Sequence, residues 1–156
     1  MARLDQEQLD RHYPQLTYET GLFMVAYLRR LHAEFGGDVT AAIVLGEIAQ
    51  HNVRHFMKEL LPRSGKDSAA LATDEVVAAS IRRCNMLSIA EASGIPRETV
   101  RRKVAKLEKL GLVSRDAAGG LAVTRKVGRQ FKEFDRETLA GLVELAERVR
   151  GLLRRR

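Results

Sequence analysis

The chain lacks most of the residues on which disulfide-rich, membrane-spanning and aromatic-rich folds depend. Its 156 residues include a single cysteine, Cys84, no tryptophan, and only 5% aromatic residues in total. One cysteine cannot form a disulfide within the chain, which agrees with a reducing compartment. The longest apolar run, residues 22–28, is far shorter than the roughly 20 residues that a membrane-spanning helix needs. Together with the small number of prolines, these absences favour a folded, mostly helical protein of the cytoplasm.

Positive charge is plentiful but unevenly distributed along the chain. The formal net charge is +7, yet residues 82–156 hold 19 Lys and Arg against 9 Asp and Glu, whereas residues 1–81 hold 8 against 11. A basic half of this kind is typical of proteins that bind nucleic acid, because Lys and Arg neutralise phosphates. The candidate site is therefore expected in the second half of the chain.

Residues 88–113 have the pattern of a short helix, a glycine turn and a longer basic helix. Apolar side chains recur at helical spacing and are expected to face one small core: Ile89, Ala92, Ile95, Val100, Val104 and Leu107. Ser88 and Glu91 form an S-x-x-E capping box that predicts the start of the first helix. Gly94 lets the chain turn, Pro96 suits the first turn of the second helix, and Gly111 ends it. The pattern predicts a helix-turn-helix.

The outward face of the second helix is mainly basic. With Val100, Val104 and Leu107 inward, it carries Arg97, Glu98, Thr99, Arg101, Arg102, Ala105 and Lys109. Residues 112–115 and 121–124, separated by a Gly119-Gly120 turn, predict a two-stranded hairpin. The unit is interpreted as a winged helix-turn-helix, and its basic face as a DNA-binding surface rather than an ordinary solvated one.

The expected fold is mainly α: a winged helix-turn-helix with a short β-hairpin wing and additional N- and C-terminal helices. Helices are predicted from Thr17 to about Phe35, from an Asp38 cap to about Leu61, and from Thr73 or Asp74 to about Arg83. After the wing, residues 125–134 are expected to continue into a long helix capped near Asp135. The predicted regions are 1–68, an N-terminal helical region for dimerisation or effector binding; 69–134, the DNA-binding domain; and 135–156, a C-terminal dimerisation helix.

The last predicted helix has a long apolar stripe that needs a cover, made of Leu139, Leu142, Val143, Ala146, Val149, Leu152 and Leu153. One interpretation is that this stripe packs on the N-terminal helices of the same chain. The other is that terminal helices of two chains pair. We favour the second, because helix-turn-helix proteins read two-fold half-sites as dimers.

Residues 88–113 resemble the helix-turn-helix of bacterial winged-helix transcription factors. The segment Arg97-Glu98-Thr99-Val100-Arg101-Arg102 is similar to the R-E-T-V-x-R segment of the catabolite-activator type. In that family the first Arg, the Glu and the last Arg reach base edges, which implies this role for Arg97, Glu98 and Arg102. Arg donates two hydrogen bonds to guanine and Glu accepts from cytosine, so a half-site with G·C pairs is expected. The order of elements along the whole chain is similar to the MarR group of dimeric regulators, although the hairpin lacks that group's D-x-R tip.

The predicted DNA contacts extend this set. Arg97, Glu98, Thr99 and Arg102 are predicted to read bases. The residues predicted to contact phosphate are Arg101, Lys103, Lys106, Lys109, Arg115 and Arg125.

Other chemistry has less support in the sequence. His51 and His55 lie four residues apart with Glu47 one turn earlier, a spacing that suits a metal, but no third histidine or cysteine pattern completes the set. We therefore expect no metal or other cofactor. Cys84 is interpreted as a small buried side chain rather than a redox switch. Without a G-x-S-x-G, phosphate-loop or H-E-x-x-H motif, the chain is not expected to be an enzyme.

The sequence thus predicts a transcriptional regulator that binds double-stranded DNA as a homodimer on a two-fold symmetric site, in the cytoplasm and associated with the nucleoid. The alternative is a winged-helix module that binds protein or RNA. A small-molecule effector between the N-terminal helices and the DNA-binding unit is left open.

Overall fold

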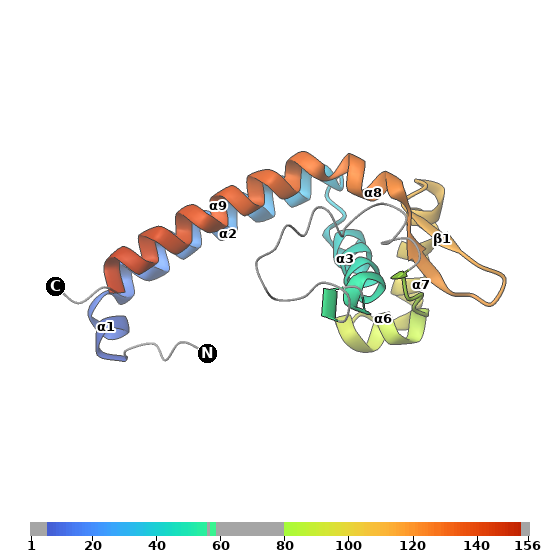
Figure 1. Cartoon of the computed structure of the whole chain (residues 1–156), viewed down its shortest axis with the longest axis horizontal. Coiled ribbons are helices and arrows are strands. Elements are labelled where there is room, and N and C mark those ends of the chain that lie inside the picture. Colours follow the sequence, from blue (N-terminus) through green and yellow to red (C-terminus); the bar gives the residue numbers. More distant parts are fainter. Residues whose placement is uncertain (1–5, 56, 59–79, 154–156) are drawn as a thin grey trace. The chain divides into compact units, whose positions relative to one another are not determined.

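The computed structural model describes residues 6–55, 57–58 and 80–153, and it is mainly helical with one small antiparallel sheet (Figure 1). The helices are α1 (Gln6–Arg11), α2 (Tyr13–Glu34), α3 (Val39–His55), α6 (Met86–Ser93), α7 (Arg97–Lys109), α8 (Arg125–Gln130) and α9 (Lys132–Leu153). The strands are β1 (Val113–Arg115) and β2 (Leu121–Val123). These elements belong to two compact units: α1, α2 and α9 form one, and residues 38–130 form the other.

The unit of residues 38–130 has a core made by α3, α6, α7 and the hairpin. The largest side chains that are at most 1% exposed and fill this core are Val44, Ile48, Asn52, Ile89, Val100, Val104, Leu107 and Leu121. The inward face predicted for α7 is therefore confirmed. On α3, Ile43 is 44% exposed and does not belong to this core. The buried face of α3 runs instead through Val44, Ile48 and Asn52, at the four-residue spacing of one helix face.

The helix pair α6–α7 is joined by the glycine turn that the sequence predicts. Gly94 ends α6 in the left-handed region with φ 67°, which a side chain would strain. The predicted capping box was wrong, because α6 begins three residues earlier than Ser88 allows. Asn85 is its N-cap, and the Asn85 carboxamide oxygen accepts a hydrogen bond from the Ser88 N–H at 2.9 Å.

The predicted hairpin is confirmed and has an additional neighbour. β1 and β2 pair antiparallel, with Ser114 opposite Ala122. Cys84 forms a bridge with Leu121 on the other side of β2. Residues 81–83, which precede this bridge, are not helical. The helix end predicted at about Arg83 is therefore too late. The start predicted for that helix, near Thr73, and the end predicted for the preceding one, near Leu61, lie outside the described residues.

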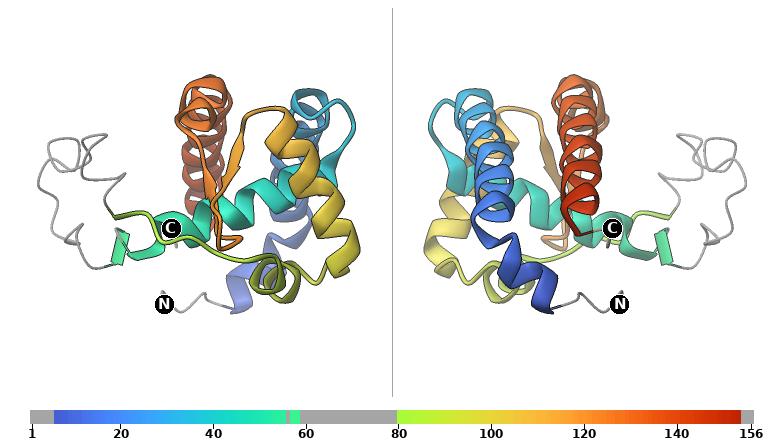
Figure 2. Two further views of the ribbon diagram at one scale, coloured as in Figure 1. Left: turned by 90° about the vertical axis from the view of Figure 1, so that its right-hand side faces the viewer. Right: turned by 90° about the vertical axis from the view of Figure 1, so that its left-hand side faces the viewer.

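In the other unit, α2 and α9 run antiparallel and side by side (Figures 1 and 2). At one end the Tyr27 and Phe134 rings are 5.7 Å apart, and at the other Arg148 pairs with Glu19 at 3.0 Å. Between them Gly141 lies against Phe23, so that a Cβ at this position would meet the ring at 3.2 Å. This glycine lets the two helices approach closely.

The long C-terminal helix begins earlier than predicted. The cap predicted near Asp135 was wrong, since α9 already starts at Lys132, and residues 125–130 before it form the separate helix α8. Phe131 between them is buried, and its ring stacks on that of Phe35 at 5.3 Å. Among the described residues, no helix combines the length and the apolar character that crossing a bilayer requires.

Candidate nucleic-acid interface

The side chains predicted to read bases lie together on the first two turns of α7. Arg97, Glu98 and Arg102 are exposed and Thr99 is half-buried. The opposite face of the helix is fixed, because Val100, Val104 and Leu107 are 0% exposed. The N-terminal end of α7 thus presents polar side chains from a rigid backbone, as recognition of base edges requires.

Glu98 and Arg101 form a bidentate ion pair on this surface. Arg101 donates to the two Glu98 carboxylate oxygens at 2.8 and 2.6 Å. These hydrogen bonds hold the pKa of Glu98 below its ordinary value. Arg102 makes a longer contact of 3.5 Å with the Thr99 hydroxyl. Glu98 is therefore ionised, and Arg101 orients its carboxylate.

Asp38 holds two of the predicted phosphate ligands. Its carboxylate accepts the Ala41 N–H at 3.0 Å, which confirms it as the cap of α3. It also pairs with Lys103 at 2.7 Å and with Lys106 at 2.8 Å. Burial alone would raise the pKa of Asp38, but the hydrogen bonds from both lysines and from the Ala41 N–H outweigh it and lower this pKa to about 2.

A fourth basic residue of the predicted set is also paired. Arg115 on β1 donates to both carboxylate oxygens of Glu108, at 3.0 and 2.8 Å, and so ties the hairpin to α7. Within the described part of the chain, Lys109 and Arg125 have no acidic partner. Of the six residues predicted to contact phosphate, the structure therefore leaves Lys109 and Arg125 outside ion pairs.

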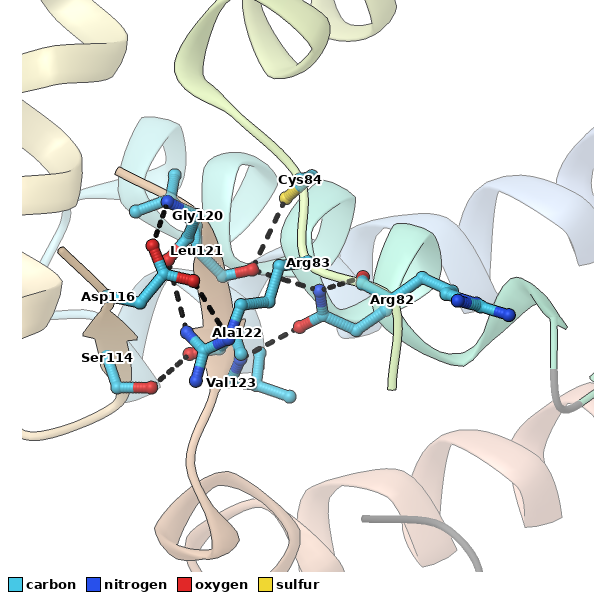
Figure 3. A network of polar contacts seen from close by, with 10 residues as sticks. Arg82, Arg83, Cys84, Ser114, Asp116, Gly120, Leu121, Ala122 and Val123 are labelled. Carbon is cyan, nitrogen blue, oxygen red and sulfur yellow. Dashed lines mark hydrogen bonds and ion pairs between the residues drawn. The ribbon is translucent and has the colours of Figure 1, made fainter. Parts of the chain in front are cut away.

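The hairpin tip is held by a small polar network (Figure 3). Arg83 pairs with Asp116 at 3.3 Å and donates to the Gly120 carbonyl at 3.1 Å. Asp116 in turn accepts the Gly120 N–H at 2.7 Å. A Cβ at Gly120 would lie 2.8 Å from the Asp116 carboxylate, so a larger residue there would have to displace that side chain. Because Asp116 and Arg83 neutralise each other, the tip presents little net positive charge.

Asn52 is an important residue of the unit of residues 38–130 that was not predicted from the sequence. Its amide donates to the Arg82 carbonyl at 2.8 Å and to the Leu121 carbonyl at 3.1 Å, and its oxygen accepts the Val123 N–H at 2.8 Å. Figure 3 shows Arg82, Leu121 and Val123 at this junction. The side chain thereby joins α3, the segment before α6, and β2. A polar residue one turn after Ile48 on a core-facing stripe was the signal that could have found it.

Lys126 was likewise absent from the predicted set. It is exposed and donates to the Leu110 carbonyl at the end of α7, at 2.9 Å. This contact satisfies a carbonyl that the helix itself leaves free. On the same helix, α8, the basic residues Arg125 and Arg129 are four positions apart and so lie on one face.

The residues considered for a metal site and for a reactive thiol belong to the same unit but lie outside α7. No group of three or more His, Cys, Asp or Glu side chains that could hold a metal occurs in the described part of the chain. His51 lies on α3, and the His55 side chain lies outside the described residues. Cys84 is 4% exposed, which confirms the buried interpretation, and burial raises the pKa of its thiol.

No protein-family model, curated protein or solved structure matches this chain. The function is therefore inferred from the residues and their geometry.

Because of the Asp38 ion pairs, the free energy of unfolding should fall at acidic pH. Because the folded pKa of about 2 lies below the ordinary 3.8, their contribution is fully present above about pH 4 and is lost as the pH falls through about 2. The Lys106 side chain is 49% exposed, so solvent screening reduces the expected loss to the order of 1 kcal/mol. Urea unfolding at about pH 5 and about pH 2 should show a smaller acid loss for Asp38→Asn than for wild type. Equal losses in the two proteins would contradict the assignment.

Proposed function

We propose that this chain is a sequence-specific DNA-binding transcriptional regulator. In this proposal α6, α7 and the β1–β2 hairpin form a winged helix-turn-helix, and α7 enters the major groove. The observation that carries the proposal is the N-terminal half of α7, where exposed Arg97, Glu98 and Arg102 stand opposite a fully buried apolar face. The order of elements supports it, since a helix, an isolated β-bridge at Cys84, two helices and a hairpin follow one another.

Base reading would be divided among the α7 side chains. Arg97 and Arg102 each offer a guanidinium that can donate two hydrogen bonds to guanine O6 and N7. Glu98 accepts hydrogen bonds and suits the amino group of cytosine. Arg101 would act on Glu98 rather than on bases, because it already donates two hydrogen bonds to that carboxylate. Lys109 and Arg125 are the predicted phosphate ligands that remain available.

The proposal includes a homodimer. The α9 helix packs on α2 of the same chain, as the intramolecular alternative expects, but this packing leaves much apolar surface uncovered. Of the residues in α2 and α9, Leu16 is the one apolar side chain that is buried. Large side chains that remain at least 44% exposed are Tyr13, Tyr18, Leu22, Met24, Val25, Leu28, Leu139, Leu142 and Val143. Apolar surface of this extent on paired helices supports association of two copies.

Selection from random duplexes tests the proposed function. The purified full chain would be incubated with the duplex library at about 0.15 M salt, where non-specific phosphate attraction is partly screened. A two-fold symmetric motif with G·C pairs in each half is expected. Enrichment of no sequence, with binding only at low salt, would favour the protein- or RNA-binding alternative.

Two α7 substitutions should separate base reading from phosphate contact. We expect Arg102→Ala to weaken binding to the selected site by about 1–3 kcal/mol and to relax its sequence preference. Lys109→Ala, which removes a positive charge from the other end of the same helix, should weaken binding to all sequences about equally. Kd values on the selected duplex and on a scrambled one measure both effects. If both variants lose affinity uniformly, Arg102 does not read a base.

A further inference from the structure

The Asp38 carboxylate uses both of its oxygens to hold lysines of α7. Oδ1 lies 2.7 Å from Lys103 Nζ, and Oδ2 lies 2.8 Å from Lys106 Nζ. The Asp38 side chain is only 14% exposed, and the Ala41 N–H donates to Oδ1 as well. The carboxylate is therefore fixed by three donors, in the place between two ammonium groups where a phosphate would otherwise be attracted.

This arrangement changes what the two lysines can do on DNA. A phosphate that approaches Lys103 or Lys106 must either displace the carboxylate or come close to its negative charge. Displacement would leave Asp38, whose side chain is largely buried, without its cationic partners beside a polyanion, which is unfavourable. Neither lysine is thus free to release counterions from DNA.

We propose that Asp38 withholds Lys103 and Lys106 from the phosphate backbone and so weakens the sequence-independent part of DNA binding. The inference rests on the proposed DNA-binding function. Phosphate contacts strengthen binding to every sequence alike, whereas the base contacts at the N-terminal end of α7 favour one. Withholding two phosphate contacts therefore weakens binding to all DNA and makes it less dependent on salt, while the base contacts of α7 stay in place.

The expected size of the effect follows from counterion release. Each phosphate neutralised contributes about 0.9 to the slope of log K against log salt, so two freed lysines should steepen this slope by about 1.8. Between about 0.05 and 0.2 M salt this corresponds to an additional fall in affinity of about tenfold.

Asp38→Asn is the first variant, because asparagine keeps the α3 cap while removing the charge. Kd values of the full chain would be measured across the salt series, on the selected duplex and on a scrambled one. The slope of Asp38→Asn should steepen by about 1.8 on both duplexes, and at low salt both duplexes should gain affinity by about the same factor. Glu47→Gln is the matched control: it makes the same change of charge on α3, and Glu47 has no ion pair in the described part of the chain. Its slope should stay close to that of wild type.

The double variant Lys103→Gln/Lys106→Gln gives an independent test. In the wild-type background it should leave the slope unchanged, and in the Asp38→Asn background it should restore the wild-type slope. A fall of about 1.8 in the wild-type background would overturn the inference, because both lysines would then contact phosphate in spite of Asp38. This result decides the matter even if Asp38→Asn does not fold, which circular dichroism would reveal. If the wild-type chain binds no DNA at any salt concentration, the proposed function fails first and the inference falls with it.

Discussion

Replacing Asn52 with leucine is expected to lower the free energy of unfolding of residues 38–130 by about 2–4 kcal/mol. The Asn52 side chain is 0% exposed and makes three hydrogen bonds to the backbone. Leucine would leave the Arg82 carbonyl and the Val123 N–H without these partners, whereas the Leu121 carbonyl would keep the Cys84 N–H. The loss is a large part of the stability of a typical domain. Urea unfolding of the full chain, followed by circular dichroism, measures it.

Gln50→Leu is the matched control for this substitution. Gln50 lies on the same helix and is exposed, so the same exchange of an amide for an isobutyl group should change stability by less than about 0.5 kcal/mol. If Asn52→Leu unfolds at the same urea concentration as this control, the three hydrogen bonds do not join the helix to the sheet in solution.

The double substitution Leu139→Glu/Val143→Glu is expected to separate the proposed dimer into monomers. Leu139 and Val143 are 62% and 59% exposed, so glutamates there should cost the single chain little. In a dimer that covers this face of α9, the same carboxylates would be buried without partners, which should weaken association by roughly a hundredfold or more. Sedimentation equilibrium measures the change directly, and affinity for the two-fold selected site should fall with it.

Ala140→Glu provides the comparison on the same helix. Ala140 is exposed and has Arg136 and Glu144 as its neighbours one turn away, so its face of α9 is already charged. This variant should keep the oligomeric state of the wild type. A wild-type chain that sediments as a monomer at all concentrations would show that the apolar face has another role.

The elements that the sequence predicts well are those whose signals are local. The inward face of α7 follows from the spacing of Val100, Val104 and Leu107, and the turns follow from glycines such as Gly94, which has positive φ. The hairpin was predictable for the same reason, because short apolar runs flank a double glycine. The start of α6 was mistaken because Asn85 and Ser88 are both good caps, and only the backbone conformation decides between them.

The features that escaped prediction depend on contacts between distant parts of the chain. The ion pair of Lys106 with Asp38 joins residues 68 positions apart, so no local sequence pattern predicts it. The bridge from Cys84 to Leu121 is a single pair, too short to give an alternating pattern. The interruption between α8 and α9 has no proline or glycine at Phe131 to mark it, and follows instead from the packing of that ring on Phe35. Consequently the exposed polar face at the start of α7 could be placed from sequence, but the pairing of the basic side chains around it could not.

The burial of Cys84 gives the protein a built-in reporter of its own opening motions. Its thiol is the chain's single sulfhydryl, and its backbone exchanges hydrogen bonds with Leu121 in both directions, at 3.2 and 2.7 Å. Because the Cys84 side chain is buried, a thiol-specific reagent can reach the sulfur only when the structure around it opens. The rate of labelling under native conditions therefore measures how often the unit of residues 38–130 opens locally, without any introduced probe.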